Sequence, residues 1–346
     1  MKDIRIRIDG RAGIITLNRP QTLNALTYPM CHAITGALNE WRTASGIDLV
    51  IFDAVGDRAF CVGGDIADMY RCGKAGDFAY GQNFWRDEYR MNAAIHEFTK
   101  PVVSFLQGYT MGGGVGIGCH GSHRIVGPGS RIAMPECSIG LVPDVGGSYI
   151  LARAPGRLGE FLAVTGHRMG PAEAIFTGFA DHYIEETNWC DLKRDLCRSG
   201  NQEAIAEAAQ PVPEGDFSGC RAQVDTLFSL ENLTEIDAAL RQSGTGFAVD
   251  CRKRMEMNSP LSMACAVALV RMQRNSTSLR DALSLEYRFV YRSLQHSDFL
   301  EGIRARIVDK DNRAAWRHSD PGAVTAAEVS QMLAPLGSNE LTWDGV

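Results

Sequence analysis

Hydrophobic and polar positions follow two different periods along the first part of the chain. Residues 4–8 and 12–17 alternate or run apolar, which predicts two strands, and Asp9-Gly10 between them is typical of a hairpin. Residues 27–44 carry apolar side chains at helical spacing, and residues 49–54 form a short apolar run that predicts a buried strand. This part of the chain therefore predicts the order strand, strand, helix, strand.

The same order continues through the middle of the chain. The pattern predicts a loop at 60–65, a helix at 78–98, a strand at 100–106, a glycine-rich turn into a helix that ends near 119, strands at 123–127 and 130–134, a loop at 136–147, and helices near 146–154 and 157–165. Repetition of strand, strand and helix indicates an α/β fold of stacked ββα units and argues against a plain doubly wound sheet.

Composition divides the chain near residue 200. We expect residues 1–198 to form the ββα core. Residues 199–222 are rich in glycine, proline and polar residues and are expected to be linker-like. Residues 223–346 follow an almost wholly helical pattern and are expected to form a helical C-terminal region. The length of 346 residues allows one large domain or two smaller ones.

Charge and cysteine usage narrow the classes of function. The net charge is −6, from 35 basic and 41 acidic residues, which gives no electrostatic reason to expect nucleic acid or an anionic membrane as a partner. No apolar run approaches the ~18–20 residues that span a bilayer. The ten scattered cysteines show no Cys-x-x-Cys pair and no zinc spacing, and the first ten residues alternate like a strand and unlike a targeting peptide. We therefore expect a cytoplasmic protein without a metal site.

Glycines gather at the start of the helix predicted after residue 111. Each interior glycine costs roughly 0.5–1 kcal/mol relative to alanine, so the cluster needs a compensating reason. One reason is tight packing of the helix on a strand, without a ligand. The other is a helix N-terminus whose bare N–H groups receive an oxyanion. Walker-type and Rossmann phosphate sites fit poorly, because no Gly-Lys-Ser/Thr and no acidic strand end follows. The glycines are Gly112, Gly113, Gly114, Gly116 and Gly118.

The loop at 60–66 offers a second set of backbone N–H groups. It follows a buried strand and leads into a helix, and it contains Gly63 and Gly64. Asp65 is either the N-cap of that helix or part of a binding loop. An oxyanion hole needs two donors that converge on one point, and two glycine-bearing strand exits on adjacent units could supply Val62 and the 112–118 turn for it.

Three carboxylates are candidates for proton transfer. Glu136 follows a proline and lies among apolar residues, which favours a raised pKa. Asp144, eight residues later, could share its site or could cap a helix. Glu88 lies on a charged helix, where a solvated position is the simpler interpretation. His120 is expected in the core or behind the site, since no histidine has metal-ligand spacing with a carboxylate. Arginines at 252, 254, 271 and 274 predict a solvated helix face or contacts with phosphate.

These motifs together resemble the crotonase (enoyl-CoA hydratase/isomerase) superfamily. They are the Asn-Arg-Pro-Gln-Thr-Leu-Asn-Ala-Leu run at 18–26 and the segments 60–66, 111–116 and 135–147, in the family's order and spacing. The 3-hydroxyisobutyryl-CoA hydrolase subfamily is the nearer likeness. Gly116 stands where hydratases carry one of two catalytic glutamates, Asp144 stands where they usually have glycine, and the helical tail at 285–288 and 298–305 is similar. The resemblance implies a crotonase-like spiral of ββα units over nearly the full length.

By that likeness, the N–H groups of Val62 and Gly113 would form the oxyanion hole and Glu136 would be the catalytic carboxylate. Asp144 and Glu88 would line the acyl pocket and meet a substrate hydroxyl. Coenzyme A would be cradled by Leu23 and by the stretch Val62, Gly63, Gly64, Asp65 and Ile66. The chain departs from the pattern at Gln21, where relatives often have lysine, and at Cys137, where threonine is more usual.

The implied reaction is hydrolysis of a short branched 3-hydroxyacyl-CoA, 3-hydroxyisobutyryl-CoA, to the free acid and coenzyme A, as in valine catabolism. Glu136 would act as a nucleophile through an anhydride or as a general base on water, and both remain open. No metal or redox cofactor is implied, because coenzyme A is part of the substrate. The likeness also implies a homo-oligomer, a trimer or hexamer.

Two alternatives stay open. The first is an enoyl-CoA hydratase or isomerase on the same scaffold. Gly116 argues against the hydratase, whereas Asp144 could serve an isomerase. The second belongs to another class, a non-catalytic acyl-CoA-binding protein, and intact carboxylates and glycine turns argue against it.

Overall fold

Two β-sheets of unequal size form the α/β core, which we describe over residues 2–343 from a computed structural model. The larger sheet has the strand order β1-β2-β3-β5-β7-β9. β1 pairs antiparallel with β2 through the predicted hairpin, and each other neighbouring pair is parallel. Its strands are β1 (Ile4–Asp9), β2 (Ala12–Leu17), β3 (Leu49–Ala54), β5 (Val102–Phe105), β7 (His123–Val126) and β9 (His182–Tyr183).

The smaller sheet contains three short parallel strands in the order β4-β6-β8. Each follows a strand of the larger sheet, so the chain passes from β3 to β4, from β5 to β6 and from β7 to β8 before its next helix. This order confirms the stacked ββα units expected from the sequence. The pattern predicted neither β6 nor β4, whose residues 60 and 61 were expected in a loop, because three-residue strands beside glycine turns carry too little periodicity. The strands are β4 (Ala59–Cys61), β6 (Tyr109–Met111) and β8 (Arg131–Ala133).

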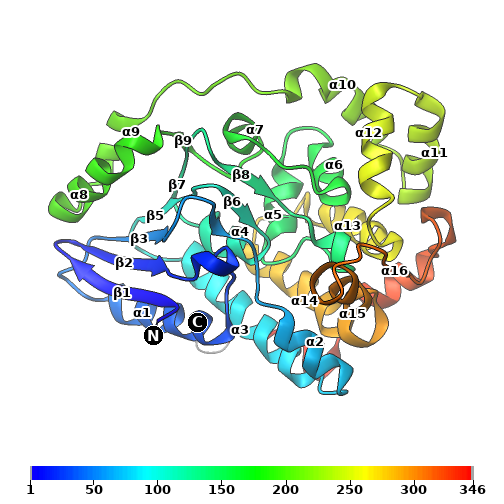
Figure 1. Cartoon of the computed structure of the whole chain (residues 1–346), viewed down its shortest axis with the longest axis horizontal. Helices are drawn as coiled ribbons and strands as arrows, with labels where there is room; N and C mark the ends of the chain where they lie inside the picture. The colour runs from blue at the N-terminus through cyan, green and yellow to red at the C-terminus, as the bar shows by residue number, and fades with distance from the viewer. Residues whose placement is uncertain (1, 344–346) are drawn as a thin grey trace.

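The helices of the ββα units cover these sheets (Figure 1). In α1 the side chain of Thr27 accepts a hydrogen bond from the N–H of Met30, and the stripe ending at Trp41 is buried. α1 packs against α3. The helices are α1 (Tyr28–Arg42), α2 (Ala67–Lys74), α3 (Ala79–His96), α4 (Gly113–Gly118), α5 (Gly147–Arg153), α6 (Leu158–Thr165) and α7 (Pro171–Phe176).

The C-terminal part is helical, as expected, and packs directly on the ββα units. α13 contacts α5 and α6, and α14 contacts α3. One hydrophobic cluster extends from Ile4 to Leu341, so the two parts share a core. The elements are α10 (Phe217–Leu227), α11 (Leu233–Ser243), α12 (Gly246–Met255), α13 (Pro260–Gln273), α14 (Leu279–His296), α15 (Phe299–Ile303), the π-helix η4 (Arg304–Val308) and α16 (Ala326–Leu333).

The segment 199–222, expected to be linker-like, is only partly irregular. It holds α9 (Glu203–Ala208) and the start of α10, and residues 209–216 run between them across one side of the molecule (Figure 1). α8 (Trp189–Ser199) and α9 pack on the larger sheet, where Leu196 and Ile205 share a second cluster with Ile51. The expected boundary at 198 thus separates two helices that cover the same sheet. Within the described residues, no helix has the length and apolar character to cross a membrane.

Close packing of α4 on β4 predicts a size limit at Gly114. A Cβ built on Gly114 would lie 2.2 Å from the backbone oxygen of Cys61. Gly114→Ala should therefore lower the free energy of unfolding by about 2 kcal/mol or more. Gly36→Ala is the matched control, because Gly36 lies in α1 with no atom within 4 Å of its Cβ position. It should be neutral or stabilising by about 0.5–1 kcal/mol. Urea unfolding measures both, and equal effects would contradict the packing argument.

Candidate active site

A cavity of about 470 Å³ collects almost all the residues expected at the site. Leu23 is the exception, although its neighbours Thr22 and Ala25 line the wall. A larger cavity of about 610 Å³ lies between α14 and α16 and contains none of the expected residues. The expected residues that line the smaller cavity are Val62, Gly63, Gly64, Asp65, Ile66, Glu88, Gly113, Glu136 and Asp144.

Two backbone segments face each other at the base of this cavity. A Cβ built on Gly63, whose φ is +110°, would lie 3.7 Å from the backbone nitrogen of Gly113. The 62–65 loop is fixed by Leu26, which donates to the Gly63 carbonyl at 2.8 Å and accepts from the Asp65 N–H at 2.8 Å. Gly113 is the first residue of α4, so its N–H has no acceptor within the helix. The two strand exits thus converge, as the sequence predicted.

Glu136 lies beside the second of these segments. It begins the short helix η2 (Glu136–Ile139) and its side chain is buried. Its Oε1 is 2.9 Å from the position of a Cβ on Gly112, and its Oε2 has no hydrogen-bond partner among the described residues. Burial raises the pKa of Glu136 well above its usual range, and the nearby Asp144 raises it further. The carboxyl group is therefore a strong proton acceptor when it is ionised.

Asp144 lies across the cavity and is held by a phenol group. Its Oδ2 accepts a hydrogen bond of 2.8 Å from the Tyr89 hydroxyl. Burial raises the pKa of Asp144 to about 7, although the Tyr89 bond acts in the opposite direction. The alternative of a helix cap is wrong, since the N-cap of α5 is Gly146. Asp144 thus changes its charge near neutral pH.

Glu88 also faces the cavity, and the interpretation of a solvated helix position is wrong. The residue lies on α3 and is 2% exposed. Its Oε1 lies 2.8 Å from the Cβ position of Gly113 and has no hydrogen-bond partner within the described chain. Burial raises the pKa of Glu88 well above its usual range, with a further contribution from Asp144. An unpaired polar atom here is available to a bound ligand.

Asp65 and Leu23, the remaining residues expected at the site, lie in and beside the 62–65 loop. Asp65 pairs with Arg19 at 2.9 Å, and the N-cap of α2 is Ile66, so Asp65 does not cap that helix. Leu23 has a left-handed φ of +53° at the end of a short turn after Arg19. The motif at 18–26 therefore shapes the wall through the Arg19–Asp65 pair, and Leu23 itself stays outside the cavity.

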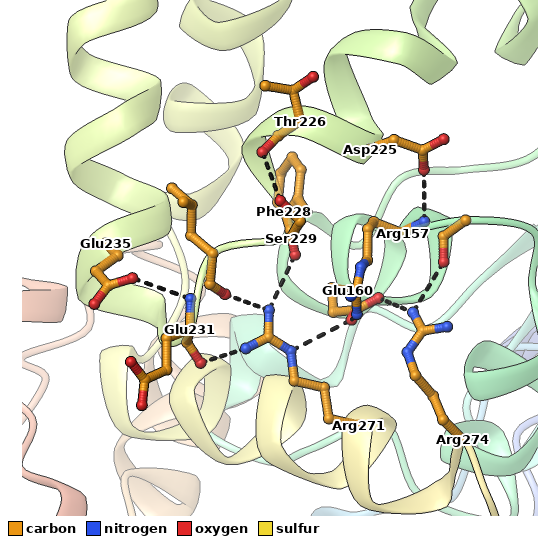
Figure 2. Close-up of polar contacts among 12 residues, drawn as sticks. Arg157, Glu160, Asp225, Thr226, Phe228, Ser229, Glu231, Glu235, Arg271 and Arg274 are labelled. Carbon is orange, nitrogen blue, oxygen red and sulfur yellow. Dashed lines mark hydrogen bonds and ion pairs between the residues drawn. The ribbon is translucent and has the colours of Figure 1, made fainter.

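The arginines at 271 and 274 do not face the cavity. Figure 2 shows that both side chains point at the buried carboxylate of Glu160, and Arg271 also donates to the Phe228 carbonyl. These contacts connect α13 with α6. Among the described residues, the basic residue that lines the cavity is Arg306. Among the described residues, no group of three or more His, Cys, Asp or Glu side chains is arranged to hold a metal ion.

Sequence reasoning missed three residues that support the site. Tyr89 follows Glu88 on α3, in a charged stretch that did not single it out as a site residue. Arg306 lies in the π-helix near the C-terminus. Glu286 accepts the N–H of Gly146 across 140 positions of sequence. The helical spacing of α3 could have indicated Tyr89. No local pattern could have indicated Arg306 or Glu286, because each lies far along the sequence from the site residues.

Known sequences that are similar to this chain belong to one protein family. Residues 12–333 match the family described as Enoyl-CoA hydratase/isomerase. The chain is 35% identical over 350 residues to the mitochondrial 3-hydroxyisobutyryl-CoA hydrolase of Gallus gallus, covering 98% of this chain and 90% of that protein. It is 34% identical over 351 residues to the protein of the same name from Homo sapiens, with the same coverage.

Two solved structures share nearly the whole fold. An enoyl-CoA hydratase from Rhodobacter sphaeroides 2.4.1 has a TM-score of 0.95 and 51% identity, over 98% of this chain and 99% of that one. A carnitinyl-CoA dehydratase from Mycobacterium thermoresistibile has a TM-score of 0.95 and 38% identity over 100% of both chains. The descriptions of these relatives name different reactions, so the reaction must be argued from the site.

The raised pKa of Asp144 predicts a pH-dependent stability. The folded protein keeps this proton up to about pH 7, whereas the unfolded chain loses it near 3.8. The folded state therefore binds more protons between these values, and the free energy of unfolding falls as the pH rises through them. Asp144→Asn removes this loss, so the variant should gain on the parent by up to about 4 kcal/mol over that window. Urea unfolding at about pH 4, 6 and 8 measures the gain. A difference that stays constant with pH would contradict it.

Proposed function

The chain belongs to the enoyl-CoA hydratase/isomerase family, and from this premise we propose that it hydrolyses an acyl-CoA thioester. We further propose 3-hydroxyisobutyryl-CoA, a short branched 3-hydroxyacyl-CoA, as the substrate. The names of curated relatives at about 35% identity support this choice. The observation that carries the proposal is a buried, unpaired carboxylate beside two converging bare backbone segments.

The backbone supplies the electrostatic part of the reaction. We assign the N–H groups of Val62 and Gly113 to the thioester oxygen, on which negative charge develops as the carbonyl carbon becomes tetrahedral. The opposed glycines support this assignment, since no side chain stands between the two segments. One such donor is worth about 3–4 kcal/mol in the transition state.

Glu136 supplies the chemical part by one of two routes. As general base, it takes a proton from water while the water oxygen bonds to the carbonyl carbon. The C–S bond then breaks, and sulfur leaves with the electron pair and takes up a proton to give coenzyme A. As nucleophile, Glu136 bonds to the carbonyl carbon and expels the thiolate, and water then cleaves the anhydride. The raised pKa of the buried carboxyl suits either route.

Two further carboxyl groups suit a hydroxylated acyl chain. Glu88 presents an oxygen without a partner, which we assign to the 3-hydroxyl of the substrate. Asp144 is held by Tyr89 on the other side and can position the substrate or pass a proton. Coenzyme A would lie along the stretch from Gly63 to Ile66, with Leu23 behind it. No cofactor besides this substrate is proposed.

The site disfavours the hydratase alternative. A Cβ built on Gly116 would lie 2.8 Å from Asn92 Nδ2 and 2.9 Å from Val145 Cβ, so no second carboxylate fits at this position. Concerted hydration needs such a group next to the water. An isomerase that uses Asp144 remains the second candidate, because its pKa of about 7 suits proton transfer.

The setting of the reaction is also proposed. All ten cysteines are free in the structure, which supports a reducing compartment, for which we propose the cytoplasm. Relatives carry mitochondrial names, and fractionation of cells distinguishes the two. A role in valine catabolism and a trimeric or hexameric assembly complete the proposal.

Replacement of the catalytic carboxylate tests the reaction. Glu136→Gln keeps the shape of the side chain but removes its basicity, so thiol release from 3-hydroxyisobutyryl-CoA should fall by about 10²-fold or more while binding persists. Glu40→Gln, at an exposed position on α1, is the control and should keep full activity. Full activity of Glu136→Gln would refute the assignment. Incubation of the parent with crotonyl-CoA separates the alternatives, because hydration and isomerisation release no thiol.

Glu88 should set the preference for hydroxylated substrates. Glu88→Leu removes both side-chain oxygens and so the hydrogen bond to the hydroxyl, and it should lower kcat/KM for 3-hydroxyisobutyryl-CoA by roughly 10-fold. Isobutyryl-CoA lacks the hydroxyl group, so its kcat/KM should change much less. Equal losses on the two substrates would show that Glu88 does not contact the hydroxyl.

A further inference from the structure

Besides Glu88, Glu136 and Asp144, which line the cavity, the buried carboxylate of Glu286 contacts the turn that carries Asp144. It belongs to α14 and is 0% exposed. Its Oε2 accepts the N–H of Gly146 at 2.8 Å, and its Oε1 accepts the N–H of Ser148 at 3.0 Å and also the Ser148 hydroxyl. These donors begin α5, whose first N–H groups have no acceptor within the helix.

The turn held by Glu286 has an unfavourable backbone. Val145 and Gly146 are both left-handed, with φ values of +52° and +80°. Left-handed backbone is a genuine outlier for a β-branched residue and persists only where the surroundings impose it. His120 donates from Nε2 to the Val145 carbonyl at 2.8 Å, and the Gly147 N–H bonds the Asp144 carbonyl at 2.6 Å. Hydrogen bonds from Glu286, from His120 and within the turn itself therefore hold this backbone.

Glu286 is costly to keep in this place. Its partners are backbone N–H groups and one hydroxyl, with no arginine or lysine paired to it among the described residues. The negative charge of Asp144 opposes the ionisation of Glu286. Burial raises the pKa of Glu286 to about 8, although its three hydrogen bonds act in the opposite direction. A buried acid without a cation, whose hydrogen bonds all go to this turn, needs a role that involves the turn.

We propose that Glu286 is a positioning residue for the thioester hydrolysis proposed above, on which this inference rests. Its carboxylate fixes the backbone of Val145 and Gly146, and this backbone aims Asp144 into the cavity, where Tyr89 completes its hold. Glu286 does not line the cavity and touches no substrate. The C-terminal helical region thereby takes part in catalysis through the main chain.

Kinetics of Glu286→Gln test the proposal. The amide keeps one acceptor oxygen but places a donor against the other of the two N–H groups, so the turn should loosen. We expect kcat to fall roughly 10–100-fold, with KM within about threefold, because the walls that bind coenzyme A stay in place. The matched control is Ser293→Ala, a buried position on the same helix whose hydroxyl bonds only within α14. It should keep its kcat. An unchanged kcat in Glu286→Gln, or an equal loss in the control, would overturn the proposal.

A second measurement separates positioning from general destabilisation and does not depend on activity. The groups that face Asp144 are Glu88 and Tyr89 from α3, Glu136 from η2 and Glu286 from α14. Carbon NMR of the side-chain carboxyl groups, assigned with Asp144→Asn, follows the titration of Asp144. A loosened turn should let water reach Asp144 and weaken the burial that raises its pKa, so the pKa of Asp144 should move downward in Glu286→Gln. An identical titration would overturn the proposal, even if the parent cleaved no thioester.

Ser148→Ala keeps the proposal testable if Glu286→Gln does not fold. This change removes one of the three donors and leaves the Glu286 carboxyl group in place. It should lower kcat by about threefold and move the pKa of Asp144 downward, as in Glu286→Gln but by less, whereas Ser293→Ala should change neither. If the parent releases no thiol from any acyl-CoA, the proposed function fails, and the titration alone then decides the role of Glu286.

Discussion

The close approach of two bare backbone segments is the constraint on which the rest of the structure depends. Gly63, after β4, and the turn of Gly112 and Gly113, after β6, lie within van der Waals distance. Both segments leave neighbouring strands of the three-stranded sheet, so the register of that sheet sets the space between them. A side chain at Gly112 or Gly113 would come within 3.0 Å of the carboxyl oxygens of Glu136 or Glu88. The small sheet is therefore the frame of the site, and its buried residues Phe60, Cys61 and Ile132 also belong to the main hydrophobic cluster.

Around this frame the protein buries three carboxyl groups. Glu88, Asp144 and Glu136 all lie in one cavity, and burial raises the pKa of each carboxyl. The cavity consequently carries less negative charge near neutral pH than its residue types suggest. This lowers the repulsion toward a phosphate-bearing ligand such as a coenzyme A ester. The shared hydrophobic core, which joins the ββα units to α13 and α14, offsets the cost of burying these groups.

Local patterns predicted the features whose cause is local. The ββα order, the glycine turn and the loop at 60–66 follow from periodicity and from the known cost of glycine, and the structure contains each of them, although β4 takes residues 60 and 61 of the loop. Glu88 was assigned to solvent from its charged neighbours, because a sequence does not show which stripe of α3 faces inward. Asp65 and Asp144 matched the pattern of helix caps, yet tertiary partners, Arg19 and Tyr89, hold them instead. The likeness to a known family added the site residues that spacing alone left open.

The contact between α14 and the Asp144 turn has a consequence for biosynthesis. Gly146 leaves the ribosome 140 residues ahead of Glu286. During that interval the nascent chain holds its glycine loops and its other carboxylates, while the strained turn lacks its acceptor. The hydrogen bonds between this turn and Glu286 can therefore form only after α14, one of the later helices of the chain, has been translated.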